Sequence, residues 1–182
     1  MRESTVYVSP WRIDVILRDG VQPHTSIATL CRAIARALDA TGAPEPSSIG
    51  LILTNDAELT ELNRAHMDTD GPTDVLSFPL LAPGTFPDHP GKAAAAPTST
   101  EAFVAPPGRG HLGDIVVSVE RAAEQAAAGR GGQTGDVQWS TRDELRLLVT
   151  HGALHVCGWD HADPVEEAAM RALEQQLLAQ ER

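Results

Sequence analysis

Residues 151–161 read HGALHVCGWDH, and this short stretch holds three of the chain's seven histidines. His151 and His155 are four residues apart, so on an α-helix both imidazoles lie on one face, one turn apart. Gly158 allows the backbone to leave the helix. His161 follows three residues later, where it can fold back toward the same point. The spacing therefore predicts that one helix and the turn after it bring three imidazoles together.

Three neutral imidazoles around one point are typical of a zinc site, with Zn–N distances of about 2.0–2.1 Å. Three protein ligands leave a fourth position for water, which a catalytic zinc needs. The alternative is that all three are ordinary polar or core histidines. Cys157 as a fourth ligand would instead make the site structural. Because Cys157 points off the face shared by His151 and His155, we expect it to pack as a small buried residue.

The same histidine spacing occurs in metzincin peptidases, H-E-x-x-H-x-x-G-x-x-H. Here the residue after the first histidine is Gly152 rather than the glutamate that serves as the peptidase's general base. The ligand geometry is retained, but peptide hydrolysis lacks its proton acceptor unless another residue supplies one.

Hydrophobic periodicity outside this stretch predicts strands alternating irregularly with helices. Residues 4–9 alternate and favour a strand, and residues 11–17 are also compatible with one. Asp56 is expected to cap a short helix, and Ser140 or Thr141 to cap the helix that carries His151. Further strands are expected at 49–53, 73–78 and 111–118, and further helices at 26–41, 119–128 and 164–180. We infer an α+β fold, a mixed sheet of about four strands packed with about five helices.

Residues 82–110 break this pattern. Seven Ala, six Pro and four Gly occur among these 29 residues, with little periodicity. Such a composition predicts a long flexible insertion, and the alternative is a lid over a site.

The chain has 182 residues, a length that predicts a single domain, residues 1–182. Its formal net charge of −11 argues against broad electrostatic binding to nucleic acid, without excluding a local phosphate site. There is no apolar run near the roughly 20 residues that span a bilayer and no secretory signal pattern. We therefore expect a cytoplasmic protein with no membrane partner.

The stretch HGALHVCGWDH resembles the H-G-x-L-H-x-x-G-[YW]-D-H signature of the YbeY family, metal-dependent endoribonucleases of rRNA maturation. Three further segments resemble the family in the right order: 61–63 (ELN), 71–79 (GPTDVLSFP) and 112–118 (LGDIVVS). The resemblance covers roughly residues 48–180.

The resemblance implies a zinc-hydrolase-like core with His151, His155 and His161 as the ligands of one Zn²⁺. It implies single-strand-specific RNA cleavage in 3′-end maturation of 16S rRNA and in late-stage ribosome quality control. The implied partners are single-stranded rRNA, the ribosome and ribosomal proteins. Two rival functions are a zinc peptidase and a non-catalytic ribosome-associated zinc protein.

The substrate contacts are less well defined. Met67 stands where many family members carry an arginine expected to contact phosphate, and Arg64, one turn earlier, is either a partial substitute or a solvated helix residue. Thr73 and Ser77 either bind phosphate oxygens or satisfy backbone groups at strand ends. The residue that transfers the proton is not visible in the sequence.

Overall fold

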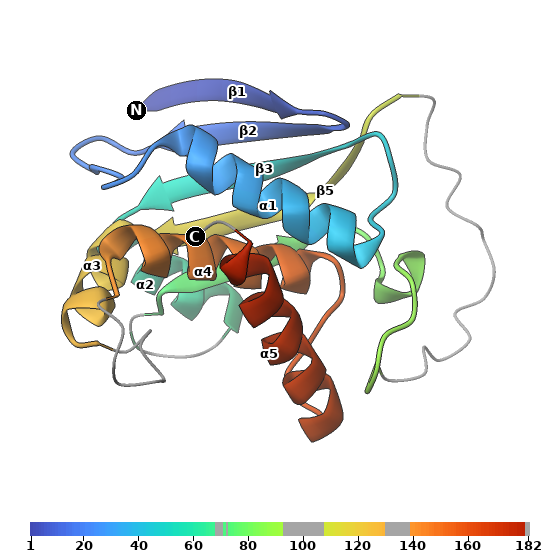
Figure 1. Ribbon diagram of the computed structural model, residues 1–182. Helices are drawn as coiled ribbons and strands as arrows, with labels where there is room; N and C mark the ends of the chain where they lie inside the picture. Colours follow the sequence, from blue (N-terminus) through green and yellow to red (C-terminus); the bar gives the residue numbers. More distant parts are fainter. Residues whose placement is uncertain (68–70, 72, 93–107, 130–138, 181–182) are drawn as a thin grey trace.

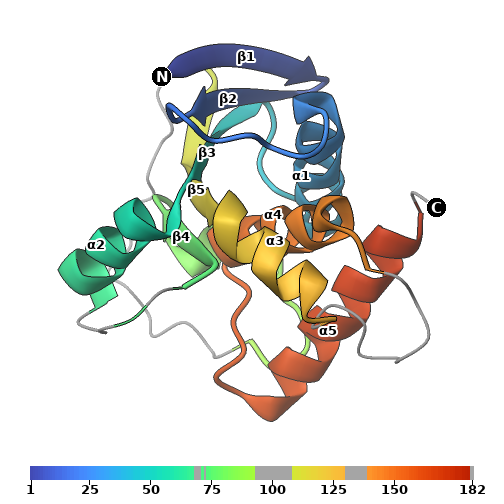
Figure 2. The ribbon, with the colours of Figure 1, turned by 90° about the vertical axis from the view of Figure 1, so that its left-hand side faces the viewer.

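The computed structural model describes residues 1–67, 71, 73–92, 108–129 and 139–180. Five strands form one mixed sheet in the order β1–β2–β3–β5–β4, so the expectation of about four strands was one too low. Helices α1, α3, α4 and α5 lie together, and α2 lies apart from them beside β4 (Figures 1 and 2). The elements are β1 (Arg2–Val8), β2 (Trp11–Leu17), α1 (Ile27–Thr41), β3 (Ser47–Thr54), α2 (Asp56–Met67), β4 (Val75–Pro79), the short 3₁₀ helix η1 (Pro83–Thr85), β5 (Gly110–Ser118), α3 (Val119–Ala127), α4 (Thr141–Val156) and α5 (Pro164–Ala179).

Residues 11–17, expected to be compatible with a strand, form β2, which pairs with β1 as an antiparallel hairpin. Trp11, Ile13 and Val15 are buried, and the residues between them are partly exposed. This alternation is the pattern expected of a strand with one face on the core. On its other side β2 pairs in parallel with β3, so it is an interior strand of the sheet.

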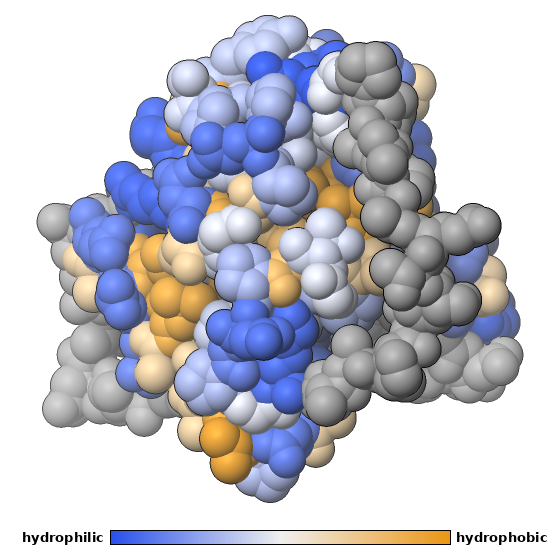
Figure 3. All heavy atoms as spheres, turned by 90° about the vertical axis from the view of Figure 1, so that its right-hand side faces the viewer, coloured by the Kyte–Doolittle hydropathy of each residue, from blue (hydrophilic) through white to orange (hydrophobic). Residues whose placement is uncertain are grey.

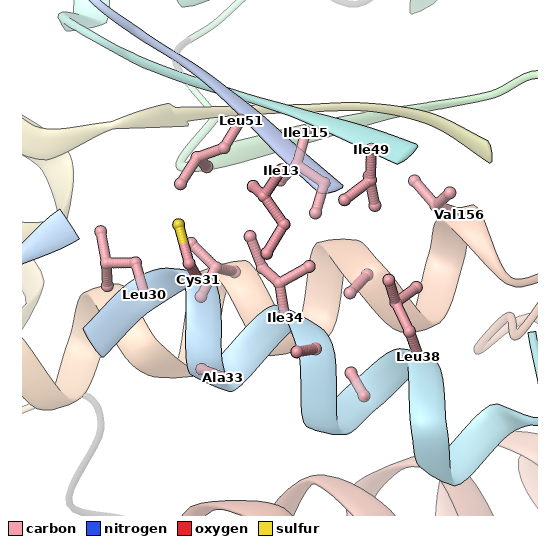
Figure 4. Packing of buried hydrophobic residues seen from close by; sticks show 14 of the residues in the cluster. Ile13, Leu30, Cys31, Ala33, Ile34, Leu38, Ile49, Leu51, Ile115 and Val156 are labelled. Carbon is pink, nitrogen blue, oxygen red and sulfur yellow. The ribbon is translucent and has the colours of Figure 1, made fainter. Parts of the chain in front are cut away.

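The main core lies between the sheet and helices α1 and α4 (Figure 4). Ile13, Leu51 and Ile115 from three neighbouring strands point at Cys31 and Ile34 of α1. All five residues are fully buried. Cys31 is therefore a packed core residue of α1.

Local signals define the ends of α1 and misplace one end of α2. Ser26 caps α1 by accepting from the Thr29 N–H, and Gly42 ends it with φ +63°. At α2 the cap is Asn55, whose Oδ1 accepts from the Glu58 N–H at 3.0 Å. The expectation that Asp56 caps this helix was wrong, because its carboxylate accepts from Ser118 and Arg121 instead.

Part of the segment predicted as a flexible insertion has a defined place in the fold. Residues 83–85 form η1, Phe86 is 4% exposed, and Gly91 lies against the backbone of Glu166 in α5. Residues 82–92 therefore differ from the expectation of an unstructured loop. Residues 93–107 of the same prediction lie outside the described residues.

The end of the molecule that carries this segment has a mostly hydrophilic surface with separate hydrophobic patches (Figure 3). The large hydrophobic side chains that are exposed within the described residues are Met1, Tyr7, Leu80 and Val165.

Candidate metal centre

Helix α4 places two of the three predicted ligands. Ser140 and Asp143 form a reciprocal capping box at its start, which satisfies backbone donors that the helix itself leaves unpaired. The helix then packs against α1, α3, β4 and β5. His151 and His155 are partly exposed near its end, with ring centroids 4.5 Å apart. The expected i, i+4 arrangement is present.

A tight turn brings the third histidine back. Gly158 adopts φ +82°, and its N–H donates to the carbonyl of His155 at 3.0 Å. The Trp159 N–H donates to the carbonyl of Leu154 at 3.1 Å, which reverses the chain against the last turn of α4. The His161 ring then lies 5.0 Å from that of His155 and 5.9 Å from that of His151.

The three rings form a group that could hold a metal ion, with one nitrogen of each within 4.8 Å of the others. Nε2 of His155 and Nε2 of His151 face each other at 3.0 Å. In a tetrahedral zinc site, ligand nitrogens lie about 3.3 Å apart. The spacing and the all-nitrogen donor set therefore fit a single ion of this kind.

Burial favours the form of His155 that binds metals. Burial, and after it repulsion by His151 and His161, lowers the pKa of its imidazole from 6.5 to about 4. A ring with this pKa is neutral at pH 7 and offers an unprotonated nitrogen.

The surroundings of Gly152 argue against the peptidase alternative. A Cβ at this position would lie 2.6 Å from Cγ2 of Ile115 and 3.2 Å from Oγ of Ser77. Position 152 therefore faces the sheet rather than the histidine rings, and a glutamate there would collide with β5. Residue 152 cannot supply the general base that a metzincin carries at this position.

Two glutamates of α5 that the sequence analysis did not single out reach the site. Oε1 of Glu174 lies 2.6 Å from Nδ1 of His151. Oε1 of Glu166 accepts from the Asp160 N–H at 2.8 Å, immediately before His161. Both glutamates lie on the helix face that includes Met170 and Leu177, which are buried. A charged residue at core-facing positions of an amphipathic helix was the signal that could have revealed them.

His89, from the segment 82–92, supports the same turn. Its ring stacks on Trp159 with centroids 3.9 Å apart and planes 7° apart. Its Nε2 lies 2.7 Å from Oε1 of Glu166, and both side chains are almost fully buried. A segment far away in the sequence therefore holds the connection that carries His161.

The other residues considered have roles within the fold. Oδ1 of Asp160 accepts from the His161 N–H at 2.7 Å, which is a turn contact. Burial raises the pKa of the Cys157 thiol to about 11, as expected of a packed residue. Thr73 donates to the carbonyl of Val75 at 3.2 Å, and Ser77 donates to that of Gly152 at 3.1 Å. Arg64 is exposed on α2.

An α+β fold with three histidine rings converging at the end of one helix defines a candidate metalloprotein of the hydrolase type. A model of the endoribonuclease YbeY family matches residues 18–182. The chain belongs to the endoribonuclease YbeY family, whose members cut phosphodiester bonds within RNA.

Named relatives agree over most of the chain. Endoribonuclease YbeY of Mycolicibacterium gilvum is 37% identical over 169 residues, which are 91% of this chain and 80% of that protein. The Salinispora tropica protein of the same name is 43% identical over 149 residues, 81% of this chain and 83% of its own length. The solution structure of TM1509 from Thermotoga maritima superposes with a TM-score of 0.49 at 20% identity, covering 93% of this chain and 90% of the other.

None of the helices in the described part of the chain is both long and apolar enough to cross a membrane.

Proposed function

We propose that this protein is an endoribonuclease that cuts single-stranded rRNA in the cytoplasm, using one Zn²⁺ held by His151, His155 and His161. The observation that carries this proposal is the convergence of three ring nitrogens within 4.8 Å in a chain of the YbeY family. The proposal extends to 3′-end maturation of 16S rRNA and late-stage ribosome quality control, with the ribosome and ribosomal proteins as partners.

The histidines of the chain would bind and orient the ion, and the ion would supply the positive charge at the substrate phosphate. A bound divalent ion supplies a Lewis acid at the phosphate in a protein whose formal net charge is −11. His155 contributes a ring that burial keeps neutral, and His161 contributes an exposed ring at the open side of the cluster. The three rings leave a position for substrate or water, as a catalytic site requires.

The proposal keeps Arg64 as a candidate contact for a substrate phosphate. Its guanidinium is on an exposed part of α2, and a permanently charged planar group suits phosphate recognition. The hydroxyl protons of Thr73 and Ser77 are already donated to backbone carbonyls. These two residues are therefore weaker candidates for phosphate binding.

The test is cleavage of a labelled single-stranded RNA by metal-loaded protein, with and without a chelator. We expect the wild-type protein to cut the RNA, and the chelator or His151→Ala to abolish cutting. His111→Ala, purified identically, is the matched control, because His111 contacts Ser48 and Asp114 and is not part of the three-histidine group. Equal cutting by wild type and His151→Ala would show that the cutting does not depend on the three-histidine group and would overturn the assignment.

The same preparation separates the rival functions. Zinc-loaded protein that binds RNA without cutting it would favour a non-catalytic ribosome-associated protein. Digestion of casein would favour a peptidase, against the steric argument at Gly152. A product with a 2′,3′-cyclic phosphate end would show that the RNA 2′-hydroxyl, rather than water, is the nucleophile.

A further inference from the structure

The shortest contact made by the three histidines to another element joins His151 to α5. Nδ1 of His151 lies 2.6 Å from Oε1 of Glu174, 23 residues further along the chain. The Glu174 side chain is only 12% exposed and that of His151 is 29% exposed. A hydrogen bond to a carboxylate is stronger when it is shielded from water in this way.

The chemistry of the two partners fixes the position of a proton. An ionised carboxylate can only accept hydrogen bonds, so Nδ1 of His151 must carry the proton that is donated to Glu174. In a neutral imidazole the other nitrogen, Nε2, then has a free lone pair. This Nε2 is the atom that faces Nε2 of His155 at 3.0 Å.

The position of Glu174 is itself fixed by packing. Its helix places it on the face of Met170 and Leu177, which are 2% and 6% exposed. Helix α5 also contacts both α4 and α1. Packing of α5 against the core therefore holds the Glu174 carboxylate at His151, and this side chain is not a flexible one on the surface.

We propose that Glu174 is a positioning residue of the metal site, and this rests on the proposed function of the three histidines. It holds His151 in the Nδ1–H tautomer, so that Nε2 points at the ion, and it limits rotation of the ring. A carboxylate behind a ligand imidazole also raises the basicity of the ligand nitrogen. Glu174 does this through Nδ1, the nitrogen of His151 that does not face His155.

The test compares Glu174→Ala and Glu174→Gln with wild type and with Glu167→Ala. Glu167 is the matched control, because it lies on the same helix and pairs with exposed Arg171. Zn²⁺ affinity is measured by competition with a chromophoric chelator, and the stability of the metal-free proteins by urea unfolding. We expect Glu174→Ala to weaken Zn²⁺ binding about 10–100-fold. Glu174→Gln should lose less Zn²⁺ affinity than Glu174→Ala, because its amide oxygen can still accept from Nδ1–H. Glu167→Ala should bind Zn²⁺ as tightly as the wild type does.

A second measurement reports the tautomer directly. Long-range ¹H–¹⁵N NMR of the metal-free wild-type protein should show the His151 proton on Nδ1, and Glu174→Ala should show a mixture of both tautomers. A purely structural role for Glu174 would lower urea stability without moving this signal.

Equal Zn²⁺ affinity in wild type and Glu174→Ala overturns the inference but leaves the metal site intact. So does a wild-type spectrum with the His151 proton on Nε2, even if the alanine variant does not fold. Failure of the wild-type protein to bind Zn²⁺ overturns the metal site, and the inference falls with it.

Discussion

The two parts of the histidine cluster are built by different means. His151 and His155 come from one helix, and their spacing follows from helical geometry and a capped, buried α4. His161 is exposed and belongs to the connection between α4 and α5. Its place depends on contacts with Glu166 and His89, which come from two other parts of the chain.

This difference separates what short-range and long-range structure contribute to a metal site. The helical part is organised as soon as α4 forms and packs. The turn that carries His161 is organised only when α5 and residues 82–92 reach their places. Damage to the helical part should therefore affect ion binding most, and damage to the supports of the turn should have graded effects.

The largest effect is expected from removing a ligand of the helical part. His155→Ala should weaken Zn²⁺ binding more than about 100-fold, because the loss of an outer partner alone costs up to that much. The fold should remain, since His155 is only partly buried and is not one of the core residues that α1 and α4 pack against the sheet. Metal content after dialysis measures the first effect, and circular dichroism the second. Global unfolding of this variant would show that the ion is needed for folding, and it would contradict the expectation that the fold forms without the metal site.

A second change alters the packing of α4 against β5 without changing a metal-binding histidine. Gly152→Ala places a methyl group 2.6 Å from the buried Cγ2 of Ile115, so α4 must shift from β5. Overpacking of this kind destabilises by about 2 kcal/mol, partly offset by the better helix propensity of alanine. Urea unfolding measures the loss. Gly110→Ala is the control, because its Cβ would meet only Ser47 Oγ at 3.5 Å. Similar stability of both variants would show that α4 can adjust at no cost.

The third prediction concerns pH. The His155 ring has a pKa of about 4 in the folded metal-free protein, against about 6.5 in an unfolded chain. The unfolded state therefore binds more protons between these values, and stability falls as the pH falls through 6.5 toward 4. At pH 5 the loss is at most about 2 kcal/mol. Zn²⁺ affinity should fall below about pH 6 as well, because protons compete for the ligands.

Urea midpoints of the metal-free protein at pH 7 and pH 5 test this. The difference should shrink in His155→Ala, because the group that takes up the proton is gone. An unchanged difference in this variant would assign the pH dependence to other groups. Unchanged zinc occupancy of the wild type at pH 5 would contradict the competition.

The comparison also explains how far the sequence could predict this site. Spacing in the chain determines the faces of His151 and His155, and Gly158 marked the turn before His161, so the cluster followed from local rules. Glu174 and His89 reach it only through tertiary packing. Their contacts depend on how α5 and residues 82–92 are placed, which spacing within the ligand segment does not encode.

The fold shows the same division. Capping residues predicted the ends of α1 and α4, and alternation indicated β1, although the number of strands was set one too low. Composition did not reveal the contacts that residues 82–92 make. Pro and Gly favour a loop there, but one buried aromatic, Phe86, and the His89–Glu166 contact fix the path. A few anchoring side chains can outweigh a loop-like composition when each of them is buried.

The smallest effect is expected from weakening a support of the turn. His89→Phe keeps a ring against Trp159 and removes the contact to Oε1 of Glu166, which then retains the Asp160 N–H. Losing one such hydrogen bond should cost about 1 kcal/mol of stability and speed hydrogen exchange at the Asp160 amide. Zn²⁺ affinity should fall by less than in Glu174→Ala, because His161 is displaced while the helical pair stays intact. Lys92→Ala, which breaks a contact to the Phe86 carbonyl within the same segment, is the control. Exchange that is equally fast in both variants would show that residues 82–92 support the turn as a whole and that His89 has no specific part in placing His161.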